Sequence, residues 1–236
     1  CEKVSTSIFR EPVNALSNLG FMFSGLVMFW ILSKDVKTND SNQFHGFTPI
    51  SILYASTVVY LGPGSMLMHG THTDWGQWAD NLSMVMYIVL PWLINLKDMG
   101  RWNIRKFFLV YLLIVVLDGI SRWFSGTLGS IGLDLFGLSI GLWCISESLY
   151  RFWSPSFRIF SGLIGFLVCA VFGIFPSEIV SNIDQYWWVI LFWIPGLFAS
   201  NTPRNSRSYS PWFILGMTSY LTAFIIWLQG VPTSSY

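Results

Sequence analysis

The sequence predicts an all-α membrane protein, a polytopic bundle with seven to eight transmembrane helices in a single domain over residues 1–236. Of its 236 residues, 53% are hydrophobic and 11% are charged, whereas a soluble domain carries about 25% charged residues. Aromatic residues make up 18%, with 13 Trp, a residue enriched where helices cross the membrane interface. Long apolar segments also recur along the whole chain, separated by short polar connections.

The apolar segments have the length of membrane spans, which need about 20 residues, roughly 17 to 25. Eight candidates follow in order: 13–33, 49–69, 79–96, 106–121, 128–149, 157–175, 185–200 and 211–229. The fourth candidate is short. The seventh contains Pro195, which can kink a membrane helix without breaking it. The expected number therefore stays at seven to eight, with a polar connection at 70–78.

The basic residues are divided unequally between the two sides of the predicted bundle. If the loops alternate sides, three of the 13 basic residues lie on one side, namely Lys3, Arg10 and Arg122. The other ten lie on the opposite side, which identifies it as cytoplasmic. We therefore expect the N-terminus and the connection 70–78 on the outer or lumenal side. The net charge of +1 gives no basic field of the kind that indicates nucleic-acid binding.

Polar residues that could take part in catalysis or metal binding are densest between Ser65 and Asp80. Ser65 and His69 are four residues apart, so they share one face of the second span. Asp80 opens the third span, and a short connection can bring it back beside His69. A His ligand for Zn²⁺, a carboxylate that positions a water and a hydroxyl that stabilises an oxyanion suit a metal hydrolase. The alternative is that His69 and Asp80 are ordinary interfacial residues and that Ser65 packs against a neighbouring helix.

A second polar group lies around the start of the first span. Glu11, Asn14 and Asn18 stand at helical spacing, and Pro12 suits a first helical turn. Glu2 and Glu11 could supply hard oxygen ligands for Ca²⁺. The alternative, helix capping and interhelical hydrogen bonds, is favoured when these residues are taken alone.

The remaining ionisable residues give weaker signals. His72 either leans toward the His69 site or lies exposed in a loop, the second being favoured. Asp118 stands four residues before Arg122, which predicts a local ion pair at a helix end. Asp134 and Glu147 are candidates for the bundle interior.

These segments together resemble the alkaline ceramidases, within the wider superfamily that includes adiponectin receptors and Per1-like proteins. The resemblance lies in Glu11-Pro-Val-Asn-Ala-Leu-Ser-Asn18, in Gly62-x-Gly-Ser65-x-x-x-His69 and in Asp80, and it is dense over 1–20 and 60–96. It implies a zinc-dependent hydrolase that cleaves the amide of ceramide to a sphingoid base and a fatty acid. A ceramide-like substrate would enter from the bilayer.

The resemblance also implies roles for single residues. Ser65 and Asp80 are the expected catalytic residues, and His69 is the expected first zinc ligand. Glu2 and Glu11, together with Cys1, match the family's N-terminal calcium motif. Ca²⁺ is therefore expected as a structural or regulatory ion and Zn²⁺ as the catalytic one.

The chain departs from the family pattern in its histidines. The family takes two further zinc ligands from a His-x-x-x-His on its last helix, and this sequence has only His45, His69 and His72. We therefore expect a fragment clipped at both ends that lacks the final helix, with the activity of this chain alone in question. The rival interpretations are a related membrane hydrolase acting on another lipid and a non-catalytic membrane receptor or scaffold.

Overall fold

The structure is a computed structural model that describes most of the chain. The described residues are 4, 9–35, 44–125, 133–204, 207, 211, 214–216, 218–219 and 221–222. Within these ranges every regular element is a helix, which confirms the all-α prediction.

The first four candidate spans are present as long apolar helices. The first is split at Asn18 into α1 (Pro12–Ser17) and α2 (Leu19–Lys34). It is followed by α3 (Pro49–Thr71), α4 (Asp74–Met99) and α5 (Ile104–Ser125). These four are long and apolar enough to cross a membrane, and they support an integral membrane protein.

The later candidates form shorter helices. They are α6 (Leu135–Phe152), α7 (Pro155–Phe160), α8 (Leu163–Val171), α9 (Pro176–Ser181), the 3₁₀ helix η2 (Trp187–Trp193) and α10 (Ile194–Phe198). The candidate 157–175 is divided by a turn at Ser161–Gly162, and 185–200 changes from 3₁₀ to α just before Pro195. Of 211–229, only a few residues up to 222 belong to the described part. The expected count of seven to eight spans is therefore not confirmed.

One predicted boundary is wrong, because the connection expected at 70–78 spans only His72 and Thr73. The Thr73 side chain accepts a hydrogen bond from the Gly76 amide at 3.1 Å and caps α4. Threonine is a favoured N-cap residue, so α4 starts at Asp74, five residues before the expected start.

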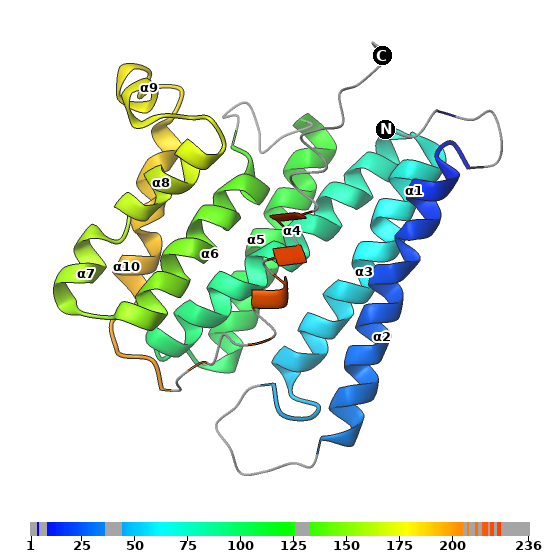
Figure 1. The fold of residues 1–236 in the computed structure, drawn as a ribbon, viewed down its shortest axis with the longest axis horizontal. Coiled ribbons are helices and arrows are strands. Elements are labelled where there is room, and N and C mark those ends of the chain that lie inside the picture. The colour runs from blue at the N-terminus through cyan, green and yellow to red at the C-terminus, as the bar shows by residue number, and fades with distance from the viewer. Residues whose placement is uncertain are drawn as a thin grey trace.

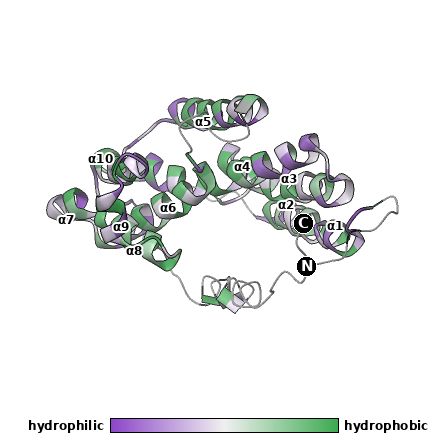
Figure 2. Cartoon of the chain, turned by 90° about the horizontal axis from the view of Figure 1, so that it is seen from above, coloured by the Kyte–Doolittle hydropathy of each residue, from purple (hydrophilic) through white to green (hydrophobic). Residues whose placement is uncertain are grey.

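The helices pack around α4, which contacts α3, α5, α6 and α10. Viewed from above, α1, α2 and α3 lie on one side of α4, and the helices from α6 to α10 lie on the other (Figure 2). Helix α5 lies along a third side of α4. Along the ribbon, α2, α3 and α4 are antiparallel neighbours, with α3 between the other two (Figure 1). The buried core is centred on α4 and α6, where Leu90, Leu93, Leu142, Ile145 and Leu149 are almost completely covered.

The outer surfaces carry large apolar side chains instead of polar ones. On α5, Leu109, Leu113 and Val116 are each more than half exposed, as are Phe23 and Leu26 on α2. Side chains of this kind face lipid in membrane proteins, while ionisable groups face the bundle interior. Asp118, which is completely buried, follows the same rule.

Candidate functional site

The segment just before α1 binds the C-terminal end of α3. The backbone amides of Arg10 and Glu11 donate hydrogen bonds to the carbonyls of Gly70 and His69, at 3.1 Å and 2.9 Å. The last carbonyls of a helix have no hydrogen-bond partner inside that helix. The segment therefore supplies donors to two carbonyl groups near the end of α3. It also brings the Glu11 side chain to the last turn of α3.

The Glu11 carboxylate joins two histidines and an asparagine. Its Oε2 lies 2.6 Å from His69 Nδ1, its Oε1 lies 3.0 Å from His72 Nε2, and Asn14 Nδ2 donates to Oε2 at 2.7 Å. An ionised carboxylate only accepts hydrogen bonds, so both ring nitrogens carry the proton in these contacts. A neutral His69 ring then keeps an unprotonated Nε2.

His72 leans toward this site, which was the less favoured of its two interpretations. It ends α3 in the left-handed region with φ of 52°, a conformation in which helices commonly end. The residue is partly open to solvent, but its ring contacts Glu11.

The surroundings of Glu11 favour its ionised form. Burial alone would raise the pKa of Glu11, but hydrogen bonds from Asn14 and His69 outweigh it, and the charge that His69 and His72 carry when protonated lowers the pKa further. The pKa of Glu11 therefore lies below its ordinary value, and the carboxylate is charged at neutral pH.

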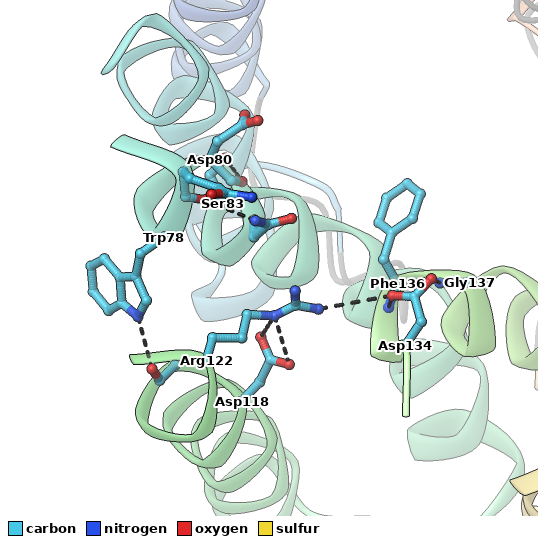
Figure 3. Close-up of polar contacts among 11 residues, drawn as sticks. Trp78, Asp80, Ser83, Asp118, Arg122, Asp134, Phe136 and Gly137 are labelled. Carbon is cyan, nitrogen blue, oxygen red and sulfur yellow. Dashed lines mark hydrogen bonds and ion pairs between the residues drawn. The ribbon is translucent and has the colours of Figure 1, made fainter. Parts of the chain in front are cut away.

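Ser65 and Asp80 meet across the contact between α3 and α4. The Ser65 hydroxyl is close enough to the Asp80 carboxylate to stabilise its charge, and His69 also acts on that carboxylate electrostatically. All three side chains are half-buried. Figure 3 shows Asp80 pointing away from the α5 side of α4, with the Ser83 hydroxyl donating to the Asp80 carbonyl at 2.7 Å. The three residues expected to act together therefore lie together.

A glycine next to Ser65 allows this close approach. A Cβ atom at Gly64 would lie 2.6 Å from Ser83 Oγ and 3.0 Å from the carbonyl oxygen of Ala79. Any larger residue would push α3 and α4 apart at the turn that carries Ser65 and faces Asp80.

Comparison with protein families places the chain in a known group. The family model described as Ceramidase matches residues 1–231. The chain belongs to the ceramidase family. Membership indicates a membrane-associated hydrolase of lipid amide bonds. No curated protein and no solved structure matches the chain.

The described residues of the chain do not complete a zinc site. No group of three His, Cys, Asp or Glu side chains among them could hold a metal ion. A catalytic zinc takes three protein ligands, and His69 Nε2 is one atom at this end of α3 that could serve as a ligand. Glu2 and Cys1 of the predicted calcium motif lie outside the described residues.

The N-terminal end of α4 lies beside a second polar cluster, part of which the sequence predicts. Arg122 Nε donates to Asp118 Oδ2 at 2.9 Å, which confirms the expected ion pair. Arg122 Nη2 also lies 3.8 Å from Asp134 Oδ1 (Figure 3). The sequence does not predict this link between α5 and α6, nor the tryptophans around it. Asp134 before Leu135-Phe136-Gly137 was the available signal, since Asp is a strong N-cap residue.

Glu147 and Asp98 hold the opposite end of the bundle together. Glu147 accepts hydrogen bonds from Asn95 Nδ2 and Arg207 Nη1, both at 2.9 Å. Asp98 accepts one from the Tyr150 hydroxyl at 2.8 Å. Glu147 therefore faces the interior, as the sequence suggested.

Proposed function

We propose that this protein is a ceramidase that hydrolyses the amide of ceramide to a sphingoid base and a fatty acid. The observation that carries this proposal is the meeting of Ser65, His69 and Asp80 where α3 ends and α4 begins. Family membership over residues 1–231 supports it.

The chemistry of the proposal rests on Asp80 and Ser65. Asp80 accepts a proton from a water molecule as the water oxygen attacks the amide carbonyl carbon. Asp80 then returns that proton to the departing amine when the C–N bond breaks. A positioned general acid–base typically contributes about 10²–10⁴-fold. The Ser65 hydroxyl turns from Asp80 to the developing oxyanion, an effect worth about 3 kcal/mol.

Glu11 and His69 support the reacting groups in this proposal. Glu11 fixes the His69 ring through Nδ1, and carboxylates commonly orient metal-binding histidines in this way. Zn²⁺ at His69, and Ca²⁺ at Glu2 and Glu11, stay proposals for the protein.

The substrate in this proposal is a lipid. It reaches the site sideways from the bilayer, because its hydrocarbon chains lie in the apolar interior of the membrane. The four long apolar helices support a membrane location. We further propose that the later helices complete a bundle of seven to eight spans, with the N-terminus and the site on the outer or lumenal side.

A panel of lipids tests the reaction class. The full-length protein in detergent is incubated with a ceramide, with a diacylglycerol and with a phospholipid, and the released fatty acid is quantified. We expect cleavage of the amide lipid and little cleavage of the esters. Cleavage of the esters alone would instead support the related hydrolase. A folded protein that cleaves none of the lipids and binds no zinc would support the non-catalytic receptor or scaffold.

A further inference from the structure

A cavity lined by Trp78 and Arg122 lies where α4 begins and α5 ends. Figure 3 shows these two side chains on the α5 side of α4, away from Asp80. The cavity has a volume of ≈540 Å³, within the range of about 300–1,000 Å³ that small-molecule sites occupy. Three tryptophans line it, Trp75 and Trp78 from the first two turns of α4 and Trp123 from the last turn of α5. The catalytic proposal uses none of them.

The three tryptophans form one fixed group at this cavity. The rings of Trp75 and Trp78 stack with centroids 4.8 Å apart, and Trp123 meets both edge-on at 5.6 Å and 5.7 Å. Trp78 Nε1 donates to the Gly119 carbonyl at 2.8 Å and so joins α4 to α5. Trp75 and Trp123 remain 52% and 56% exposed, and exposed tryptophan faces attract cations.

One positive and one negative group complete the lining. The Arg122 side chain is only 10% exposed, and its Nε and Nη2 are directed to Asp118 and Asp134. Asp134 in turn accepts hydrogen bonds from two backbone amides at the start of α6. Within the described part of the chain, Asp74 at the cavity makes no ion pair or side-chain hydrogen bond. The lining therefore offers one free carboxylate, Asp74, and the N–H groups of Arg122 that its contacts with Asp118 and Asp134 leave unused.

This charge pattern discriminates between classes of ligand. A simple anion would meet Arg122, but it would also face Asp74, Asp118 and Asp134. A simple cation would meet Asp74 and the tryptophans, but it would face Arg122. A zwitterion places a charge of each sign opposite its complement, and Gln77 and Asn81 add amide groups to the lining.

The position of the cavity indicates where such a zwitterion comes from. Trp75, Trp78 and Trp123 stand at the ends of two helices that are long enough to span a membrane. Tryptophan concentrates at the depth of the lipid headgroups. A zwitterionic group at that depth is the headgroup of a bilayer lipid.

We propose that this cavity binds the phosphocholine headgroup of a bilayer lipid. The quaternary ammonium lies against the exposed faces of Trp75 and Trp123 beside Asp74, and the phosphate lies beside Arg122. This site is separate from the amide-cleaving site, so neither proposal depends on the other.

The test measures lipid binding to the full-length protein by native mass spectrometry from detergent. Four lipids with the same acyl chains are titrated: phosphatidylcholine, phosphatidylglycerol, a cationic trimethylammonium lipid and diacylglycerol. We expect phosphatidylcholine to be retained at the lowest concentration. Equal retention of all four lipids, or preference for the anionic or the cationic one, would overturn the proposal.

Two variants locate the binding on the protein. Trp123→Ala should weaken retention of phosphatidylcholine about two- to five-fold, as expected for an exposed cation–π contact. Asp74→Asn should do the same, up to about five-fold, as for an exposed ion pair. Trp30→Ala is the matched control, because Trp30 is 63% exposed at the end of α2 and lies outside the cavity. If Trp123→Ala does not fold, Asp74→Asn decides, and unchanged binding in that variant refutes the site.

Discussion

Glu11 has more polar partners at the candidate site than any other side chain there. It contacts His69, His72 and Asn14, and its backbone amide caps the end of α3. Its side chain is 10% exposed, so its loss would leave two imidazoles without a partner. The residue therefore connects the start of the first span to the end of α3.

Replacing Glu11 by Gln should destabilise the protein. The amide keeps one acceptor oxygen in place of two and presents an N–H₂ group to one imidazole. Hydrogen bonds to charged groups contribute about 1.5–3 kcal/mol, so the thermal midpoint in detergent should fall clearly. Glu178→Gln is the matched control, because Glu178 is exposed and has one side-chain bond, from the Tyr186 hydroxyl. Equal midpoints for Glu11→Gln and the native protein would show that these contacts contribute nothing.

Asp118 and Arg122 make a second test at the residue scale. Asp118 is fully buried, and Arg122 neutralises it. Removing one partner of a buried pair costs about 3–5 kcal/mol, because the other charge stays buried. Arg122→Gln should therefore lower the midpoint of thermal unfolding strongly. Adding Asp118→Asn should restore much of that loss. Additive effects of the two substitutions would contradict this coupling.

At the residue scale the sequence predicts the members of the site better than their contacts. The four-residue spacing of Ser65 and His69 is fixed by helix geometry, and the short connection returns Asp80 to the same end. The Glu11–His69 contact has no local signal, because the residues are 58 positions apart in the chain. It depends on how the segment before α1 crosses the end of α3.

At the scale of elements, the site depends on the close contact between α3 and α4. Gly64 allows it, and Thr73 caps α4 after a connection of two residues. The sequence predicts both helices from their apolar length. It misplaces the start of α4, because Trp75 and Trp78 lie among polar residues that resemble a loop.

Gly64→Ala should separate the two helices. The new methyl group would lie 2.6 Å from Ser83 Oγ, and overpacking of this kind typically costs about 1–3 kcal/mol. Both the thermal midpoint and the hydrolysis rate should fall, since Ser65 and Asp80 move apart. Gly20→Ala is the control, because nothing lies within 4 Å of its Cβ and Ala favours a helix over Gly. Equal behaviour of the two variants would argue against a tight contact.

Elements in the second half of the chain are harder to predict from composition. The apolar stretch 185–200 predicts one helix, yet it forms two elements, η2 and α10. Pro195 lacks an N–H and favours the first turn of a helix, so a new helix begins just before it. Hydropathy measures length and apolarity, and it carries no information about which turns remain α-helical.

The whole molecule is organised with polar groups inside and apolar groups outside. Asp118 and Asn95 are buried, while the leucines of α5 are exposed. The low charge content of the sequence predicts this arrangement, because a chain with so few charges cannot cover its surface with polar groups.

Leu113→Arg tests the membrane location of α5. Leu113 is 53% exposed near the middle of the helix, and an arginine at the centre of a span costs about 2.5–3.5 kcal/mol of insertion free energy. The fraction of protein that resists alkaline extraction from membranes should fall. Phe124→Arg at the end of α5 is the control and should have little effect. Equal extraction of both variants would contradict a membrane-embedded α5.

The central claim is that Asp80 is catalytic in amide hydrolysis. The most direct test is to measure amide hydrolysis by the Asp80→Ala variant. The native protein and the variant are compared at equal folded concentration, verified by thermal unfolding, with release of the sphingoid base from ceramide as the readout. Asp184→Asn, an exposed carboxylate outside the site, serves as the matched control. We predict that Asp80→Ala folds but releases no sphingoid base, whereas the control keeps full activity. Full activity in a folded Asp80→Ala protein would contradict the assignment of the site.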